Sequence, residues 1–350
     1  MKIWIATGGT GGHIFPALAV AEELIARGHR VIVSSDSRGM KIVKKSNPPL
    51  SGTAFIWASG VGGKSRIKQV FALMKIALSA SALVMRWALL RPDRVVAFGG
   101  YSSVPAVLAA RIWKIPTLLH EQNAAIGRAN KFAMRWVDTL MTSFPSVYGI
   151  PKSFKKVVYT GLPVRKEFTS QISNLNSQLL TLLITGGSLG AQILDDVAPI
   201  AIADLPSSLK KKLFVVHQTR PENVITLRKT YESAGVRANV LSFIHDMADQ
   251  MSASSLIIGR SGASTVAELQ VLGRPAILVP LVINPDQVAN AEAFAAQGSG
   301  FCVMQNKFTP KWLNVTLTEL FENPARLAKM AEKAKVPNDA VNKISAEILK

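Results

Sequence analysis

The chain has 350 residues, 48% of them hydrophobic and 18% charged, which predicts about two globular domains and excludes a disordered chain or a small disulfide scaffold. Its single cysteine, Cys302, excludes an intrachain disulfide and a cysteine-based metal site. The formal charge of +19 is uneven: residues 1–160 hold 22 Lys and Arg against 6 Asp and Glu, which indicates a polyanionic partner, either nucleic acid or an anionic membrane.

The first predicted strand, residues 2–6, runs directly into a glycine loop with the sequence Thr7-Gly8-Gly9-Thr10-Gly11-Gly12-His13. No signal peptide is expected, because no apolar stretch of adequate length precedes this loop. A helix is predicted from Pro16 to Arg27, with Gly28 as its C-terminal stop. Short apolar strands at residues 31–34, 94–98 and 117–121 alternate with helices, which predicts a parallel α/β sheet.

The most apolar segment, residues 64–91, needs a separate interpretation. Lys75 and Arg86 interrupt it, so it is too short and too charged for a membrane-spanning helix. Its periodicity leaves two alternatives, a buried amphipathic helix and a helix that lies on a membrane surface. The surface alternative offers apolar side chains to lipid and basic ones to headgroups, namely Phe71, Met74, Leu78 and Trp87, and Lys64, Arg66 and Lys68.

The same pattern restarts in the second half of the chain. A strand at residues 180–184 leads into Thr185-Gly186-Gly187, which repeats Thr7-Gly8-Gly9 at an offset of 178 residues. Further strands are predicted at residues 213–217, 239–241, 256–259 and 276–279. We therefore predict two Rossmann-like domains that face a cleft, residues 1–158 and 159–337, with a linker within 149–163. A final helix, residues 338–350, is expected to pack back on the first domain.

Glycines after a first strand let the backbone approach a ligand closely, and the amides of the following helix attract anions. Neither loop has the spacing of a dinucleotide fingerprint or of a P-loop. His13 is a candidate general base, or alternatively a helix-terminal histidine with a local hydrogen bond. No metal-binding motif occurs, so neither a metal nor a cofactor is expected.

A second candidate site opens the helix after the strand at residues 256–259. The amides of residues 260–265 could meet a diphosphate, and Glu268 could accept two ribose hydroxyls. The alternative is a capping arrangement with a solvated carboxylate. The polar loop at residues 284–290 suits sugar hydroxyls.

Together these motifs resemble the MurG family of peptidoglycan N-acetylglucosaminyltransferases, in the family's order and over nearly the whole chain. The matching segments are Thr7–His13, Gly99–Pro105, His120–Asn123, Gly161–Arg165, Gly186–Ala191, Phe243–Met247, Arg260–Glu268 and Asp286–Asn290. The resemblance implies a GT-B fold of two Rossmann-like domains. It implies an inverting transfer of GlcNAc from UDP-GlcNAc to the C4 hydroxyl of MurNAc in undecaprenyl-diphosphoryl-MurNAc-pentapeptide (lipid I), with formation of the β(1→4)-linked lipid II.

The resemblance also implies the place of this reaction in peptidoglycan synthesis, and hence in cell wall biogenesis, cell shape and cell division. It implies a peripheral protein on the cytoplasmic face of the inner membrane, which favours the surface alternative for residues 64–91. The expected partners are UDP-GlcNAc, lipid I, the anionic membrane and proteins of a cell-wall synthesis complex. Nucleic acid is not expected, because no nucleic-acid motif occurs.

By the same resemblance, residues are expected to bind each substrate. The donor residues are Thr10, Gly11, Gly12, Asn123, Arg165, Ser188, Ile244, Ala263, Ser264, Thr265, Glu268, Gln287 and Asn290. The acceptor diphosphate is expected at Gly8, Gly9, Gly99, Gly100 and Tyr101. Inversion requires a base, for which His13 is the first candidate and Glu121 the alternative.

The chain departs from the family pattern at three positions. Leu162 and Leu189 stand where the family usually has Asn and Gln, and Arg128 stands where the family often has Leu. These differences put the local donor geometry in question more than the reaction. Another GT-B enzyme, with a different donor sugar or acceptor, is the alternative function.

Overall fold

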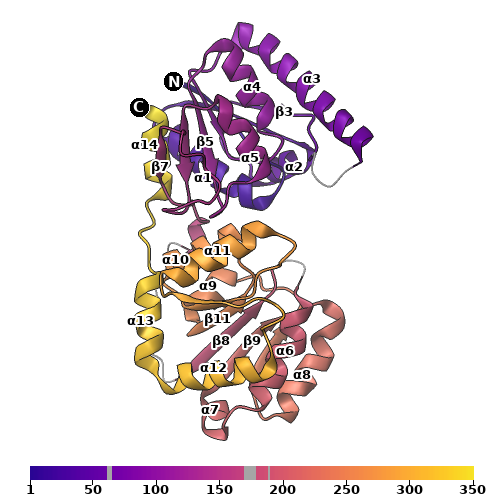
Figure 1. Ribbon diagram of the computed structural model, residues 1–350, viewed down its shortest axis with the longest axis vertical. Coiled ribbons are helices and arrows are strands. Elements are labelled where there is room, and N and C mark those ends of the chain that lie inside the picture. Colours follow the sequence, from indigo (N-terminus) through magenta and orange to yellow (C-terminus); the bar gives the residue numbers. More distant parts are fainter. Residues whose placement is uncertain (61–64, 169–178, 188–189) are drawn as a thin grey trace. The chain divides into compact units, whose positions relative to one another are not determined.

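The computed structural model describes residues 1–60, 65–168, 179–187 and 190–350 (Figure 1). Their contacts divide the chain into two units. Unit 1 comprises Met1–Arg165 and Asn338–Lys350, and unit 2 comprises Lys166–Pro337. Each unit has its own parallel sheet, and the α/β class is therefore confirmed.

The described strands of unit 1 form a sheet in the order β3-β2-β1-β4-β5-β6-β7. Both faces of this sheet are covered, which is why its strands are apolar on both sides: Ile3, Trp4 and Ile5 are all fully buried. The strands are β1 (Lys2–Ala6), β2 (Arg30–Ser35), β3 (Gly52–Phe55), β4 (Arg94–Ala97), β5 (Thr117–Glu121), β6 (Thr139–Thr142) and β7 (Val157–Tyr159).

Helices cover this sheet from both sides. On one face, α1 packs with the C-terminal helix α14 through Ile344 and Ile348 (Figure 1). On the other face, α3 packs against α4 and the sheet through Leu83 and Trp87. The helices of unit 1 are α1 (Gly11–Ala26), α2 (Ser37–Ser46), α3 (Arg66–Leu90), α4 (Val104–Trp113), α5 (Arg128–Ala133), the 3-10 helix η1 (Met134–Trp136) and α14 (Ala340–Leu349).

Unit 2 repeats this architecture with the strand order β10-β9-β8-β11-β12-β13. Its strands are β8 (Leu180–Thr185), β9 (Leu213–Gln218), β10 (Arg237–Leu241), β11 (Leu256–Gly259), β12 (Ala276–Leu278) and β13 (Gly300–Cys302). Its helices are η2 (Lys166–Phe168), α6 (Gln192–Ala203), α7 (Ser207–Lys212), η3 (Pro221–Asn223), α8 (Val224–Ser233), α9 (Met247–Ala253), α10 (Ala263–Leu272), α11 (Pro285–Ala296), α12 (Pro310–Glu322) and α13 (Pro324–Ala334).

The order of the strands reverses at the same place in both units. In unit 1 the chain crosses from β3 back past β1 to β4, and in unit 2 from β10 back past β8 to β11. The loops after β1 and β4, and after β8 and β11, therefore open at a topological switch point, where open α/β sheets bind ligands. The two repeated glycine loops are the first members of these two pairs.

Three sequence-based expectations about the fold were wrong. Helix α1 begins at Gly11 rather than Pro16, which lies inside the helix, because the helix starts directly after the glycine loop. The expected linker at residues 149–163 contains β7, which pairs with β6 and extends the first sheet. For the same reason unit 1 continues to Arg165, beyond the boundary expected at residue 158.

Helix α3 offers a direct test of this packing. Trp87 is fully buried and its ring lies edge-on to Trp4, with 5.3 Å between the ring centres. We expect Trp87→Ala to lower the free energy of unfolding by about 3–5 kcal/mol, since it removes a large buried side chain and leaves a cavity. Leu89, two residues later, is 88% exposed, and Leu89→Ala should change stability by less than about 0.5 kcal/mol. Urea unfolding of both variants measures the difference, and equal effects would contradict the packing.

Candidate active site

The two loops at the switch point of unit 1 meet backbone to backbone. A Cβ atom added at Gly100 would lie 2.8 Å from the Cα of Gly8, and one added at Gly8 would lie 3.1 Å from the Cα of Gly100. Gly99 and Gly100 also have positive φ angles, of 81° and 76°, which other residues rarely adopt. Both loops therefore need glycine for close approach and for backbone conformation.

Asp36, at the end of β2, joins these loops. Its Oδ1 accepts hydrogen bonds from the amides of Arg38 and Gly39 at 3.0 Å, and its Oδ2 accepts one from the Ser102 hydroxyl at 2.7 Å. A Cβ atom at Gly9 would lie 2.1 Å from Oδ1, so this carboxylate requires glycine there. Sequence reasoning missed both α2 and Asp36, although an Asp directly after an apolar strand is a residue type that favours helix N-caps.

A cavity of about 410 Å3 opens beside the two loops. It is lined by Gly8, Gly9, Thr10, His13, Asp36, Ser37, Arg38, Ala58, Ser59, Gly60, Gly100, Tyr101 and Ser102. Four of the five residues expected at the acceptor diphosphate line it, together with the candidate base. The fifth, Gly99, lies next to Gly100 in the same loop.

His13 lies in the first turn of α1 and is held by residues that follow two other strands. Its Nδ1 is 3.0 Å from Oε1 of Gln122, which follows β5. The Nε2 of Gln122 donates to the Phe98 carbonyl, after β4, at 2.7 Å. Burial lowers the pKa of His13, and hydrogen bonding with Gln122 and with the Phe98 carbonyl partly opposes this effect. The ring is therefore neutral near pH 7, the form in which an imidazole accepts a proton.

Glu121, the alternative base, has a different environment. Its Oε1 accepts from the backbone amide and the side chain of Asn123, at 3.0 and 3.2 Å. Its Oε2 accepts from the Gly127 amide and from Asn130, at 2.9 and 2.8 Å. Burial raises the pKa of Glu121, and these hydrogen bonds oppose the rise. Both carboxylate oxygens are thus engaged in holding the turn at residues 122–127.

In unit 2, the loop after β8 is held by side chains at the strand end. Thr185 donates from its hydroxyl to Gln218 at 2.6 Å, and the Gly187 amide donates to the same hydroxyl at 3.3 Å. Gly187 and Gly190 have positive φ angles of 77° and 68°. Ser188, a predicted donor residue, and Leu189, where the family usually has Gln, lie outside the described residues.

The neighbouring loop after β11 leads into α10, whose first turn contains the predicted Ala263, Ser264 and Thr265. Its N-cap is Gly262, which has no side chain to bond the first amides. These partly exposed amides form the kind of helix N-terminus that binds phosphate. Glu268 lies one turn further along α10 and is buried.

Hydrogen bonds connect this loop to the start of α11. The Ser261 hydroxyl donates to the Gln287 carbonyl at 2.7 Å, and the Asn290 side chain donates to the Ser261 carbonyl at 3.1 Å. The Leu281 amide donates to Oε1 of Gln287 at 3.0 Å, which directs the NH2 group of that side chain away from the loop backbone. Asn290, a predicted donor residue, is thus buried in the loop connection.

The remaining predicted residues are placed as follows. The side chain of Ile244 is buried in the loop between β10 and α9, and its expected backbone contact with uracil stays a prediction. Arg165 is the last residue of the first segment of unit 1. Leu162, where the family usually has Asn, is buried and apolar contact replaces a polar group there. Among the described residues, no group of three His, Cys, Asp or Glu could hold a metal ion.

Helix α3 presents two apolar faces. The expectation that this segment is too short and too charged to span a membrane was wrong, because by length and composition the 25-residue helix could do so. It packs, however, on the rest of unit 1 through Ala72, Ile76, Leu83 and Trp87. Trp87 was expected to be available to lipid, and this was wrong because its side chain belongs to the core. The opposite face exposes other predicted residues, Phe71, Met74 and Leu78, and the basic residues Arg66 and Lys68. Lys64 lies outside the part of the chain that the structure describes.

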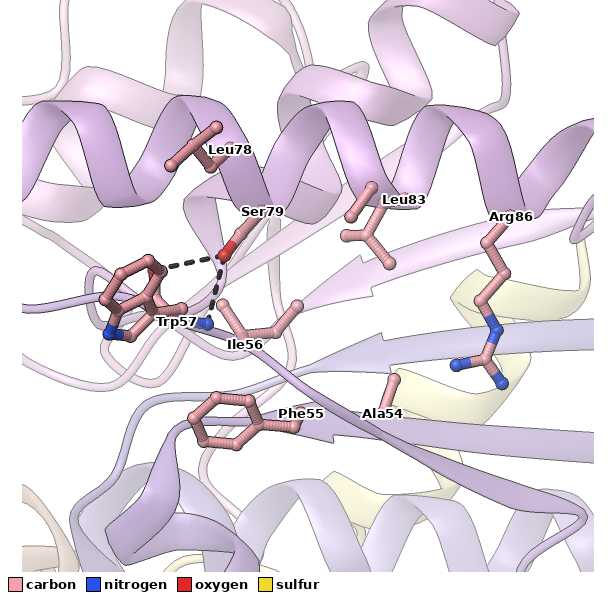
Figure 2. Close-up of a pocket in the computed structure, with 9 residues that line it drawn as sticks. Ala54, Phe55, Ile56, Trp57, Leu78, Ser79, Leu83 and Arg86 are labelled. Atoms are coloured by element: carbon pink, nitrogen blue, oxygen red, sulfur yellow. Dashed lines mark hydrogen bonds between the residues drawn. The ribbon is translucent and has the colours of Figure 1, made fainter.

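Beside α3, an apolar groove of about 550 Å3 runs along β3 (Figure 2). The Ser79 hydroxyl bonds both the amide and the carbonyl of Trp57 at 3.0 Å, so the polar backbone at its floor is satisfied. Phe55 and Trp57 line one side and Leu78 the other, with Arg86 at one end (Figure 2).

Comparison with known proteins identifies the family. The glycosyltransferase family 28 N-terminal domain matches residues 3–142, and the family 28 C-terminal domain matches residues 181–345. UDP-N-acetylglucosamine--N-acetylmuramyl-(pentapeptide) pyrophosphoryl-undecaprenol N-acetylglucosamine transferases are similar over nearly their full length. That of Methylobacterium sp. (strain 4-46) is 40% identical and covers 99% of this chain and 96% of its own. That of Rhodospirillum centenum is 41% identical and covers 95% of this chain and 89% of its own length. The chain belongs to the MurG family.

Solved structures agree with this assignment. A crystal structure of Acinetobacter baumannii MurG is 34% identical, with a TM-score of 0.82 over 99% of each chain. A glycotransferase of kitacinnamycin, 16% identical with a TM-score of 0.70, shares the fold alone. The predicted family, the GT-B fold class and the class of enzyme, a glycosyltransferase, are therefore confirmed.

The buried His120 of this MurG-family chain gives its stability a pH dependence of defined sign. Burial lowers its pKa to about 4, although the Gly161 carbonyl accepts a hydrogen bond from Nε2 at 3.0 Å. An unfolded histidine has a pKa of about 6.5, so the unfolded state binds more protons between these values. The stabilising contribution is complete above about pH 6.5 and is lost as the pH falls through about 4. It amounts to about 3 kcal/mol.

We expect His120→Phe to remove this contribution, because phenylalanine can stack on Phe98 as His120 does but cannot be protonated. Between pH 7 and pH 4, the free energy of unfolding should fall by about 3 kcal/mol less in the variant than in wild type. His245→Phe, at an exposed histidine, is the matched control and should follow wild type. Parallel pH profiles of His120→Phe and wild type in urea unfolding would refute the assignment.

Proposed function

We propose that this MurG-family chain transfers GlcNAc from UDP-GlcNAc to the C4 hydroxyl of MurNAc in lipid I, with the acceptor on unit 1 and the donor on unit 2. Identity of about 40% over nearly the full length of the transferases supports the reaction. The observation that carries the assignment of the site is the cavity of unit 1, where the glycine loops and His13 lie together at the switch point. A cleft between the units stays a prediction.

In the proposed step, the C4 oxygen of MurNAc attacks the anomeric carbon of GlcNAc from the face opposite UDP. The new C–O bond forms as the bond to UDP breaks, and UDP leaves with the bonding electrons. Nε2 of His13 takes the proton of the C4 hydroxyl. Attack from the opposite face inverts the anomeric centre and gives the β(1→4) linkage.

The environment of Glu121 favours a structural role over the alternative of base. Each of its oxygens already accepts two hydrogen bonds, from the turn at residues 122–127 and from Asn130 of α5. Accepting a substrate proton would weaken at least one of these bonds, and a buried donor without a partner costs about 1–3 kcal/mol. The side-chain contact of His13 with Gln122 is made by Nδ1, so Nε2 is the ring nitrogen that we assign to the substrate proton.

On unit 2, the first turn of α10 would bind the donor diphosphate through its amides, with Glu268 on the ribose hydroxyls. The Gln287 amide group, oriented by Leu281, would donate to a GlcNAc hydroxyl. Ile244 would contact the uracil through its backbone, and Arg165 and Ser188 would contact the diphosphate. Thr10, Gly11, Gly12 and Asn123 of unit 1 would complete the sugar site.

On unit 1, the acceptor diphosphate would bind at Gly8, Gly9, Gly99, Gly100 and Tyr101. The Asp36 carboxylate beside Gly9 repels an anion, but three donors already neutralise part of its charge. The first turn of α1, which has no side-chain cap, supplies attraction from its amides. We therefore place the diphosphate toward the α1 end of the cavity.

Steady-state kinetics of variants can distinguish the roles of His13 and Glu121. We expect His13→Ala to lower kcat by about 100- to 10,000-fold, the usual contribution of a general base. Glu121→Gln sets the NH2 group of the new glutamine against the N–H donors that now bond Glu121. It should therefore chiefly lower stability and retain kcat in the folded fraction. Glu268→Ala should mainly raise the KM for UDP-GlcNAc. The assay follows UDP release and disaccharide-lipid formation from UDP-GlcNAc and a short-chain lipid I analogue.

A different result reassigns the base. Full kcat in His13→Ala, with loss of kcat in a stably folded Glu121→Gln, would move the base to Glu121. Absence of transfer by a folded wild type that binds UDP would overturn the proposed donor sugar or acceptor.

The exposed face of α3 is the proposed membrane surface. Phe71 and Leu78 are 58% and 56% exposed, and Trp57 and Phe55 extend this apolar area across the groove of Figure 2. Arg66 and Lys68 lie at the N-terminal end of the helix, and the first half of the chain carries the excess of positive charge. Such a surface fits a peripheral protein on an anionic leaflet, here the cytoplasmic face of the inner membrane. Participation in a cell-wall synthesis complex stays a prediction from the resemblance.

We expect the double variant Phe71→Asp and Leu78→Asp to bind vesicles with anionic lipid about 100-fold more weakly, since two apolar side chains contribute about 3 kcal/mol. Transfer to a water-soluble acceptor should be retained, because neither residue lines the cavity. The control is Ile225→Asp and Ile200→Asp, which makes the same change at exposed apolar positions of unit 2. Co-sedimentation with vesicles measures both, and equal weakening in the two double variants would contradict a surface on α3.

A further inference from the structure

We infer that Gln122 is a positioning residue that fixes the ring tautomer of His13, with the proton on Nδ1 and the lone pair on Nε2. This inference rests on the proposed role of His13 as the base. Gln122 lies between Glu121, the alternative base, and Asn123, an expected donor residue, and has no expected role of its own. Its two polar atoms reach two different elements, the Phe98 carbonyl after β4 and the His13 ring on α1.

The orientation of the Gln122 amide is determined by its partner on the far side. A backbone carbonyl only accepts hydrogen bonds, so the atom 2.7 Å from the Phe98 oxygen must be the NH2 nitrogen. The carbonyl oxygen Oε1 therefore faces His13. Gln122 is only 2% exposed, which leaves no room for water to stabilise the reversed amide.

The same reasoning then determines the histidine. Oε1 of Gln122 only accepts, and it lies 3.0 Å from Nδ1 of His13. Nδ1 must therefore carry the proton, because the other tautomer would set two lone pairs against each other in a buried contact. In the neutral ring the lone pair is then on Nε2, the nitrogen that a general base uses here.

The absence of a side chain at Gly99 leaves space for this arrangement of Gln122 and His13. A Cβ atom there would lie 3.2 Å from Oε1 of Gln122, tighter than ordinary contact, and its φ of 81° disfavours other residues. The chain from the Phe98 carbonyl through Gln122 to His13 thus links the ends of β4 and β5 to α1. After Nε2 takes the substrate proton, the Nδ1–H bond to Oε1 also stabilises the positive ring.

The first test uses wild type and needs no turnover. In 15N spectra of histidine-labelled protein, with the His13 signals assigned from the His13→Ala variant, the neutral ring should be protonated at Nδ1. A neutral ring protonated at Nε2 would overturn the inference. Because this readout is independent of substrates, it decides the tautomer even where wild type fails to transfer GlcNAc, a failure that would count against the proposed function instead.

The second test changes Gln122. Gln122→Met keeps the size but removes the acceptor, so both tautomers should appear and kcat should fall about 10- to 100-fold. The acid limb of the kcat profile should move to lower pH, because hydrogen bonding to Gln122 raises the pKa of His13. The KM values for donor and acceptor should stay within about twofold. Gln297→Met, the same change at a hydrogen-bonded glutamine at the C-terminal end of α11, should leave tautomer and profile unchanged.

Gln122→Glu gives a shift of opposite sign. It keeps an acceptor beside Nδ1 and adds a negative charge, which favours the protonated ring, so the acid limb should move to higher pH. A purely structural role of Gln122 predicts lower stability in both variants with no displacement of the acid limb in either, and that result would overturn the inference. If Gln122→Met does not fold, Gln122→Glu and the wild-type spectrum still decide.

Discussion

The close approach of the backbone at Gly8 to the backbone at Gly100 is the constraint on which the site of unit 1 depends. The two loops leave neighbouring strands where the strand order reverses, so they share one edge of the sheet. A single methyl group on either glycine would force them apart. Because α1 starts directly after the first loop, the position of His13 is set by the same backbone. Residues 36–38 and 58–60, which follow β2 and β3, complete the lining of the cavity beside it.

Buried polar groups complete the geometry that the glycines allow. Side chains that are buried at the carboxyl edge of the sheet have little access to water, so most of their polar atoms hydrogen-bond with other protein groups. In unit 1 these partners are Gln122 for His13 and the turn at residues 122–127 for Glu121. In unit 2, Gln218 accepts a hydrogen bond from Thr185, and the backbone carbonyl of Gln287 accepts one from Ser261. An unpaired buried donor costs about 1–3 kcal/mol, so each network restricts its side chains to one orientation.

Much of the fold followed from short apolar strands between glycine turns, and β1, β5 and β11 have the predicted bounds. The predicted start of α1 was wrong because the helix begins within the glycine loop, at Gly11, and Pro16 lies inside it. Strand β7 was missed because it is an edge strand of three residues with little burial. The role of Gln122 depends on the ends of β4 and β5 lying side by side, which no local sequence pattern reveals. The contact between Asp36 and Ser102 likewise depends on the position of β2 in the sheet.

Helix α3 shows how one segment can meet two demands. Residues 76, 80, 83 and 87 recur at helical spacing and are all buried, which is the pattern of a core face and explains Trp87. Residues 67, 71, 74 and 78 recur at the same spacing and are all exposed, although folding requires no apolar side chains there. A helix in water would ordinarily carry polar residues on that face. Since the inner face already supplies the packing, the outer face is available for the proposed contact with lipid, and substitutions on one face need not affect the other.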